Sequence, residues 1–262
     1  MVSTFRAESP NTWAEGSFYA RGQLVPDQTE GKGRNGPFTK LKLRCFLLTP
    51  EALEALVCWP KRLEVFQLKF SFGDDYSTMG LHTEWTLAML KQILAIHRST
   101  LRSIKLYAVN VAGLADFDLR EFESLEELSL SSACTGHQYP VQSYMMGSFT
   151  NLLAPRLRVF QWDLTLENQQ HCEGMDSFDQ KEEDWLRALV REALARGCPL
   201  QSIEIKFTPS SSHCFNGIYP WDRMDALGAD LRPYGIKVRY NTPSINREEF
   251  SKTVENTKKQ EA

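Results

Sequence analysis

The sequence predicts an α/β protein whose short strands stack side by side in a parallel sheet, with helices along one side. The first observation is a recurring signature in which an apolar residue is followed by a second one three positions later and a third two positions after that. Helical periodicity fills the segments between copies, and a polar residue separates the last two apolar positions. The copies are Phe38/Leu41/Leu43, Leu63/Phe66/Leu68, Leu101/Ile104/Leu106, Leu125/Leu128/Leu130, Leu157/Phe160/Trp162, Leu200/Ile203/Ile205 and a weaker Leu231/Tyr234/Ile236.

The alternation within each signature indicates a strand that is buried on one face only. Residues two apart on a strand point to the same side, so the second and third apolar residues face the core. A doubly wound α/β enzyme fold also alternates strands with helices, but its strands are buried on both faces and read as continuous apolar runs. Intervening residues such as Lys42 and Glu204 would be costly to bury, so a one-sided solenoid is favoured.

The spacing of the copies predicts an irregular array. It ranges from 24 residues, between Leu101 and Leu125, to 43 residues, between Leu157 and Leu200. Leucine-rich repeats typically span about 20 to 29 residues, so longer helices or loops are expected between some strands. We therefore predict an irregular leucine-rich-repeat solenoid with parallel concave strands and convex helices.

Three segments follow from this prediction. The solenoid occupies residues 38–241. Residues 1–37 contain many Gly and Pro and no sustained period, so they are predicted to form an irregular N-terminal segment or cap. Residues 242–262 are predicted to form a polar C-terminal helix or tail.

Helix start and stop signals lie between the signatures. Thr49 before Pro50 is typical of an N-cap followed by proline at the first helical position. Asp179 and Glu182 fit a capping box, and Gly197 fits the residue after a helix end. The predicted helices begin, in chain order, at or near Thr49, Thr83, Asp179, Trp221 and Asn246.

Composition limits the partners and the compartment. The 262 residues carry 30 Lys and Arg against 33 Asp and Glu, a net charge of -3. We predict no nucleic-acid partner, because phosphate neutralisation needs clustered cations. We also predict no membrane partner and an intracellular location, cytoplasmic or nuclear, since no secretory signal or membrane-spanning run is visible. The 6 cysteines form no CxxC pair, which fits a reducing compartment.

Catalytic motifs are missing from the sequence. Residues 31–36 fit the pattern GxGxxG, but no strand precedes them and Pro37 follows where a phosphate-binding helix should begin. The pattern therefore favours a loop. We predict that the chain is not an enzyme and needs no cofactor.

Two adjacent His-Cys pairs are the remaining candidates for metal chemistry. His171 and Cys172 follow the fifth signature at an offset similar to that of His213 and Cys214 after the sixth. Stacked repeats could bring the pairs together as zinc ligands, but adjacent ligands lack the usual spacer. Polar loop residues are the favoured interpretation, and no metal site is predicted.

The outward strand positions form the candidate partner-binding surface. In the first three strands they are basic, and in the next three they lean acidic. Such a bipolar face would orient a partner of opposite charge gradient, whereas a merely solvated face is the alternative. Tyr107 is the expected aromatic anchor. The candidate residues are Lys42, Gln67, Lys69, Lys105, Tyr107, Glu127, Ser129, Gln161, Asp163, Glu204 and Lys206.

Three stretches, LLAPRLRVFQWD from Leu152, EEDWL from Glu182 and LQSIEIKFTP from Leu200, together resemble the leucine-rich region of F-box proteins from filamentous fungi. The resemblance implies a substrate receptor of a cullin-type ubiquitin ligase, in which an F-box binds a Skp-type adaptor and the repeats bind the target. Residues 1–37 lack the expected Leu-Pro start and amphipathic helices, so a Skp-type adaptor is expected only if an F-box is present. The alternative is a stand-alone leucine-rich-repeat scaffold or regulator without a ubiquitin-ligase connection, and the third possibility is an enzyme with an unrecognised site.

Overall fold

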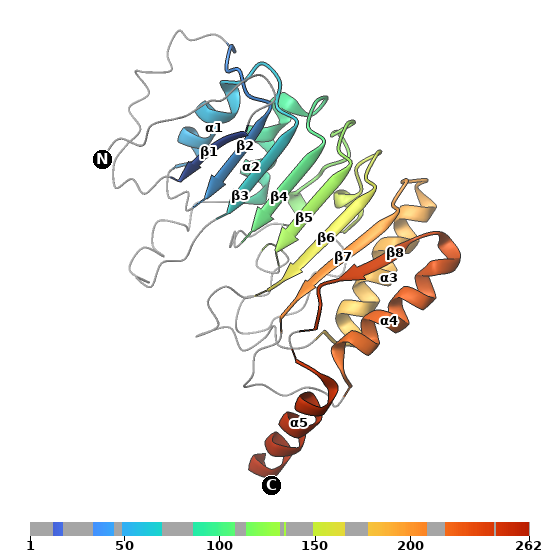
Figure 1. The fold of residues 1–262 in the computed structure, drawn as a ribbon. Coiled ribbons are helices and arrows are strands. Elements are labelled where there is room, and N and C mark those ends of the chain that lie inside the picture. Colours follow the sequence, from blue (N-terminus) through green and yellow to red (C-terminus); the bar gives the residue numbers. More distant parts are fainter. Residues whose placement is uncertain are drawn as a thin grey trace.

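Eight parallel strands form one sheet in the computed structural model, and their order in the sheet follows their order in the chain (Figure 1). Parallel neighbours require a crossover that returns the chain to the same end of the sheet. The predicted parallel α/β fold is confirmed. The strands are β1 (Trp13–Ser17), β2 (Lys40–Arg44), β3 (Val65–Lys69), β4 (Ser103–Tyr107), β5 (Glu127–Ser131), β6 (Val159–Leu164), β7 (Ser202–Phe207) and β8 (Lys237–Tyr240).

The structure describes part of the chain. For residues 13–17 it describes the backbone alone. The other described residues are 34–44, 49–69, 86–107, 114–131, 134, 149–165, 178–208, 218–243 and 245–261.

Adjacent strands from β2 to β8 keep one register, so equivalent positions of the signatures lie side by side. Leu41 of β2 aligns with Phe66 of β3, and this row continues across the sheet. From β2 to β7 every apolar residue of the two rows is at most 1% exposed. The rows are Leu41, Phe66, Ile104, Leu128, Phe160, Ile203 and Val238, and Leu43, Leu68, Leu106, Leu130, Trp162, Ile205 and Tyr240.

Helices α1 to α4 lie on one face of the sheet, the face that carries these apolar rows (Figure 1). Helix α5 follows β8 in the chain and extends away from the sheet (Figure 1). The α-helices are α1 (Pro50–Cys58), α2 (Leu87–Leu94), α3 (Gln180–Ala195), α4 (Pro220–Leu231) and α5 (Arg247–Glu261). Short 3-10 turns are η3 (Ala95–His97), η4 (Leu114–Asp116), η6 (Phe149–Leu152) and η8 (Arg232–Tyr234).

Threonine side chains cap the N-termini of α1 and α2. Thr49 Oγ1 accepts a hydrogen bond from the backbone of Ala52 at 3.4 Å, as the sequence predicts. Thr86 Oγ1 accepts from the backbone of Met89 at 3.1 Å, so α2 begins at a different threonine from the one expected. The expected cap, Thr83, lies outside the described residues.

The predicted signals of α3 are confirmed. Asp179 accepts from the backbone of Lys181, and Glu182 accepts from the backbone of Asp179, each at 2.8 Å. This reciprocal pair satisfies donors that the first turn leaves without intrahelical partners. Gly197 follows the helix with φ 65°, a left-handed conformation that favours glycine.

Aromatic rings join the helices to the sheet. Trp185 of α3 packs on Trp162 and Phe160 of β6, with ring centroids 4.8 and 5.6 Å apart. Trp221 of α4 meets Phe207 of β7 edge-on at 5.6 Å. Each buried aromatic side chain of this kind stabilises the fold by about 2 to 3 kcal/mol through removal of apolar surface from water.

A backbone ladder repeats at the entries to β4, β5, β6, β7 and β8. Arg102 donates its N–H to the Glu64 carbonyl at 2.8 Å, and Glu126 donates to the Arg102 carbonyl at 2.9 Å. The series continues with Arg158, Gln201 and Lys237, each donating to the preceding member at 2.8 to 2.9 Å. Each entry turn is therefore held directly by the one before it.

Two further sequence expectations differ from the structure. Residues 13–17, within the segment predicted to be irregular, form β1 and pair with β2. The weak seventh signature is wrong, because Leu231 ends α4 and Tyr234 is 59% exposed. The seventh repeat instead uses Ile236, Val238 and Tyr240, in a pattern one residue shorter than the others.

Gly36, the last glycine of the GxGxxG pattern, has a packing role. Its N–H donates to the Trp59 carbonyl at 3.0 Å, and it pairs with Pro60 in a parallel bridge. A Cβ at this position would lie 3.1 Å from the Pro60 backbone, which leaves little room for a side chain. The glycine therefore permits close approach of two segments. Residues 31–33 of the pattern lie outside the described residues, so the loop stays a prediction.

Candidate functional site

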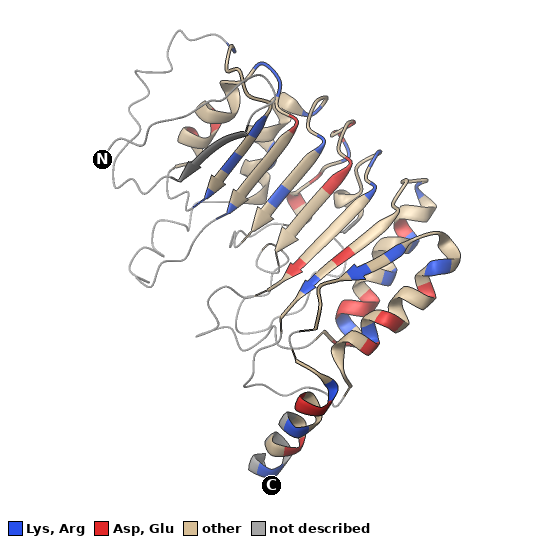
Figure 2. Ribbon diagram, viewed as in Figure 1, with Lys and Arg blue, Asp and Glu red and all other residues tan. Residues whose placement is uncertain are grey.

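The candidate site is the sheet surface opposite α1 to α4. We call it the polar face and define it by alternate residues of β2 to β8, whose neighbours in sequence point into the apolar core. Figure 2 shows charged residues spread along these strands. The polar face comprises Lys40, Lys42, Arg44, Val65, Gln67, Lys69, Ser103, Lys105, Tyr107, Glu127, Ser129, Ser131, Val159, Gln161, Asp163, Ser202, Glu204, Lys206, Lys237 and Arg239.

All the candidate binding residues predicted from the sequence lie on this face. The register orders them into rows that cross the strands. The middle row is Lys42, Gln67, Lys105, Ser129, Gln161, Glu204 and Arg239, and the row nearer the strand ends is Arg44, Lys69, Tyr107, Ser131, Asp163 and Lys206. Side chains far apart in sequence are thus neighbours on one surface, while their role in binding stays a prediction.

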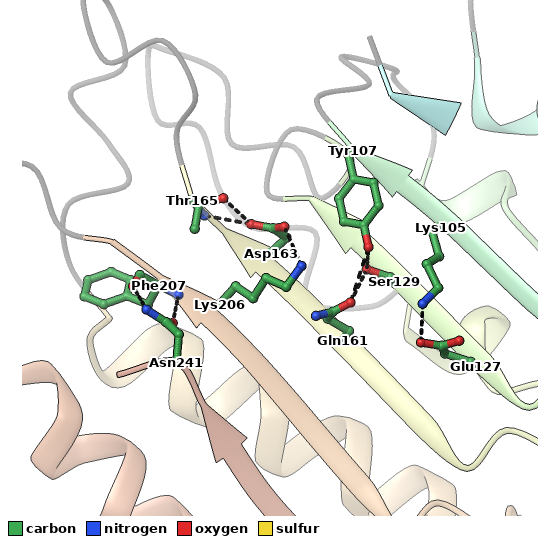
Figure 3. A network of polar contacts seen from close by, with 10 residues as sticks. All are labelled: Lys105, Tyr107, Glu127, Ser129, Gln161, Asp163, Thr165, Lys206, Phe207 and Asn241. Carbon is green, nitrogen blue, oxygen red and sulfur yellow. Dashed lines mark hydrogen bonds and ion pairs between the residues drawn. The ribbon is translucent and has the colours of Figure 1, made fainter. Parts of the chain in front are cut away.

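A hydrogen-bonded network occupies the centre of the polar face (Figure 3). Ser129 donates to Gln161 Oε1 at 2.9 Å, and the Tyr107 hydroxyl donates to the same oxygen at 3.4 Å. The Ser129 and Tyr107 hydroxyl oxygens lie 3.3 Å apart. Ser129 is 0% exposed and Gln161 is 7% exposed. Such buried polar groups are stable because they satisfy one another, and the network fixes the position of the tyrosine ring.

Glu127 anchors one side of this network. Its Oε1 accepts from Lys105 Nζ at 2.6 Å, and its Oε2 accepts from Ser103 Oγ at 2.8 Å. Both partners come from β4, the neighbouring strand. The carboxylate is therefore neutralised and hydrogen-bonded within the face.

Asp163 anchors the other side. Its Oδ1 accepts from the backbone N–H of Thr165 at 3.0 Å and from the hydroxyl of the same residue at 2.5 Å. Its Oδ2 lies 3.6 Å from Lys206 Nζ, and that ammonium also sits 5.3 Å from the centroid of the Tyr107 ring. Lys206 therefore links the acidic group to the central aromatic side chain.

The structure revises the predicted charge gradient. Glu127, Asp163 and Glu204 lie on β5 to β7 as expected, and each contacts a cation of the polar face (Figure 2). The cation beside Glu204 is Arg239 of β8, at 3.7 Å. Sequence reasoning missed Arg239 because the seventh signature was misplaced. The alternation of apolar and basic residues from Ile236 to Tyr240 was the signal that could have placed it.

The two His-Cys pairs cannot be compared with the structure, because His171, Cys172, His213 and Cys214 lie outside the described residues. Among the residues that are described, no group of three or more His, Cys, Asp or Glu is arranged to hold a metal ion.

Two described cysteines have environments that favour the thiol over the thiolate. Burial raises the pKa of Cys58 and of Cys198 above the usual value. Cys198 Sγ also lies 3.4 Å from the carbonyl oxygen of Leu157. Protonated, partly buried thiols are poor nucleophiles, so neither side chain is favoured as a nucleophile.

The chemistry available at the centre of the polar face is hydrogen bonding. Ser129 is its buried hydroxyl, and its described partners are the Tyr107 hydroxyl and the Gln161 amide. The described helices include none with the length and apolar composition needed to cross a membrane.

Comparison with known proteins found no relative of this chain. No protein-family model matches the chain, and neither a curated protein nor a solved structure matches it.

Proposed function

We propose that this chain is a protein-recognition module that binds its target through the polar face. The observation that carries the proposal is the arrangement of this face, in which polar and charged side chains form one row across β2 to β8 and a second row across β2 to β7. Rigid surfaces with ordered polar side chains bind at a lower conformational cost than flexible ones. Tyr107, held by the central network, is the proposed anchor.

The proposal includes a finer fold assignment, an irregular leucine-rich-repeat solenoid. Three features support it: strands in chain order, the apolar rows of the repeated signature, and the backbone ladder from Glu64 to Lys237. Solenoids of stacked repeats commonly use an extended sheet surface to hold partners.

The proposed pathway is recruitment of a substrate to a cullin-type ubiquitin ligase. Its support is the resemblance of LLAPRLRVFQWD, EEDWL and LQSIEIKFTP to fungal F-box proteins. A Skp-type adaptor belongs to the proposal only where an F-box is present. A stand-alone scaffold or regulator would use the same polar face without that adaptor.

Site-specific crosslinking tests the binding surface. A photoreactive p-benzoylphenylalanine is placed at Tyr107 and, as the matched control, at Arg191, an exposed residue of α3 on the helix side. The crosslinked protein is identified, purified and titrated against the intact chain. We expect Tyr107→Ala to raise Kd at least about tenfold and Arg191→Ala to leave it unchanged.

The outcome separates the alternatives. Equal affinity of Tyr107→Ala and the unaltered chain would remove the polar face as the recognition surface. Recovery of a Skp-type adaptor together with the target would favour the ligase receptor. A target that binds directly while purified adaptor shows no affinity for the chain would favour the stand-alone scaffold.

A further inference from the structure

The acidic groups at the centre of the polar face are already occupied. Both oxygens of Glu127 accept hydrogen bonds from β4, and both oxygens of Asp163 contact donors from Thr165 and Lys206. A cationic partner would compete with Lys105, Ser103 and Lys206 for these carboxylates. The centre is therefore poorly suited to a basic ligand.

Hydrogen-bond donors at the centre of the polar face can make further hydrogen bonds. Gln161 accepts two hydrogen bonds through Oε1, while its Nε2 makes none with any residue that the structure describes. Lys105 and Lys206 each have three N–H donors, and each makes one ionic contact within the described part of the chain. The centre of the face can therefore donate additional hydrogen bonds, while its carboxylates already pair with its own cations.

The neighbouring strands add positive charge. At their polar-face positions β2 and β3 carry cations and no acidic residue, as Figure 2 shows in blue. The register places Arg44 and Lys69 in the row that continues to Tyr107. Cationic residues therefore lie beside Tyr107 on the N-terminal side of the sheet.

Resting on the proposed function, we infer that the target presents an extended acidic segment that crosses β3 to β7 over Tyr107. Carboxylates of the segment accept from Gln161 Nε2 and from the ammonium groups of Lys105 and Lys206. Four inter-strand steps of about 4.8 Å span about 19 Å, which corresponds to about six residues of extended chain. An acidic polypeptide of about this length would match the donor character of this part of the face.

A polypeptide fits better than a nucleic acid. A sugar-phosphate backbone places a charge on every nucleotide and needs a continuous cationic track. On this face Glu127, Asp163 and Glu204 interrupt such a track. Carboxylates spaced along a peptide can lie between these acidic residues.

Fluorescence anisotropy with the intact chain tests the inference. The probe is a fluorescein-labelled peptide of twelve residues with alternating Glu and Gly, and the comparison peptide alternates Lys and Gly. We expect the acidic peptide alone to bind, with an affinity that falls as salt rises from about 20 mM to about 500 mM because the charges become screened.

Substitutions locate the binding. Gln161→Glu keeps the oxygen that accepts from Ser129 and replaces the Nε2 donor, so Kd for the acidic peptide should rise about tenfold. Glu204→Gln, in the same row on the next strand, should lower Kd about threefold. Lys206→Gln, at a half-exposed site, should raise Kd about threefold even where Gln161→Glu proves unstable. Arg191→Gln on α3 should change nothing.

Several results would overturn the inference. One is equal binding of the basic peptide, another is an acidic-peptide affinity that neither Gln161→Glu nor Lys206→Gln alters, and a third is tighter binding of oligothymidylate of equal length. Absence of peptide binding, combined with a crosslinked target that still depends on Tyr107, would overturn the acidic segment and leave the recognition surface intact. A crosslinked target whose Kd is unchanged by Tyr107→Ala would overturn the proposed function itself.

Discussion

The imidazole of His97 joins Val57 at the end of α1 to Leu63 at the entry of β3. Its Nε2 donates to the Val57 carbonyl oxygen at 2.8 Å, and its Nδ1 accepts from the Leu63 backbone at 3.3 Å. Because an N–H points at Nδ1, the ring is the neutral tautomer with its proton on Nε2. The residue is 1% exposed, so this bridge lies within the protein.

Acid should destabilise the fold through His97. Burial lowers its pKa below 6.5, and the charge of Arg34 lowers it further. Below pH 6.5 the unfolded chain binds a proton that the folded state excludes, so the stabilisation is complete above pH 6.5 and is lost as pH falls toward the folded pKa. Urea unfolding at pH 7.5 and 5.5 measures this loss. His97→Gln should show a smaller loss, and identical losses would contradict the assignment.

Asp179 should act in the opposite direction. Burial and the neighbouring Glu182 raise its pKa to about 6. Its contribution is then complete below pH 3.8 and is lost as pH rises through about 6, because the folded state holds the proton more tightly than the unfolded chain. Asp179→Asn retains a capping side chain. We expect it to raise the free energy of unfolding by about 1 kcal/mol at pH 7.5, allowing for solvent screening, and by much less at pH 4.

The carboxylate of Glu183 is the centre of an ionic cluster between α3 and α4. It lies 2.6 Å from Arg223 and 2.9 Å from Arg187, and Arg187 also contacts Asp230 at 2.9 Å. Glu183→Ala would leave the mostly buried Arg223, whose side chain is 14% exposed, without this anion, whereas Arg187 would keep Asp230. We expect a loss of about 3 kcal/mol in the free energy of unfolding, measured by urea titration.

The exposed pair of Glu248 and Lys252 on α5 provides the control for this cluster. Glu248→Ala should cost less than about 0.5 kcal/mol. A similar cost for Glu183→Ala and Glu248→Ala would show that the inter-helix cluster contributes no more than a surface pair.

The start of α5 is held by aromatic packing. Phe250 is 3% exposed and meets the Tyr219 ring edge-on at 5.4 Å, while Arg247 lies over that ring and pairs with Asp222. Phe250→Ala should speed amide exchange in residues 247–261 at least about tenfold and leave β4 to β7 unchanged, because the sheet does not depend on this helix. Uniformly faster exchange throughout the chain would instead place α5 within the main cooperative unit.

Local chemistry explains what the sequence could predict. The caps of α1 and α3 depend on side chains one turn away, so Thr49, Asp179 and Glu182 identify them without knowledge of the fold. The apolar residues of β2 to β7 were equally visible, since a strand with one buried face imposes a two-residue period. These same periods placed the candidate residues on one surface.

Non-local pairing explains what the sequence could not predict. The segment WAEGS of β1 lacks the apolar alternation of the other strands, and its extended conformation depends on pairing with β2. The contact between Lys105 and Glu127 is diagonal, because Lys105 aligns in register with Ser129. Such a contact depends on side-chain direction as well as strand order. The sequence alone therefore could not predict that cations of the polar face pair with its acidic residues.

The backbone ladder has a mechanical consequence. The entries of β4 to β8 are each hydrogen-bonded to the strand entry before them, and the order of the strands in the sheet follows their order in the chain. Tension applied between the two termini would therefore peel strands from the edges in succession. Between the signatures of β2 to β7, each rupture would release 24 to 43 residues, or about 80 to 150 Å of extended polypeptide, giving a sawtooth of unequal steps in a force-extension trace.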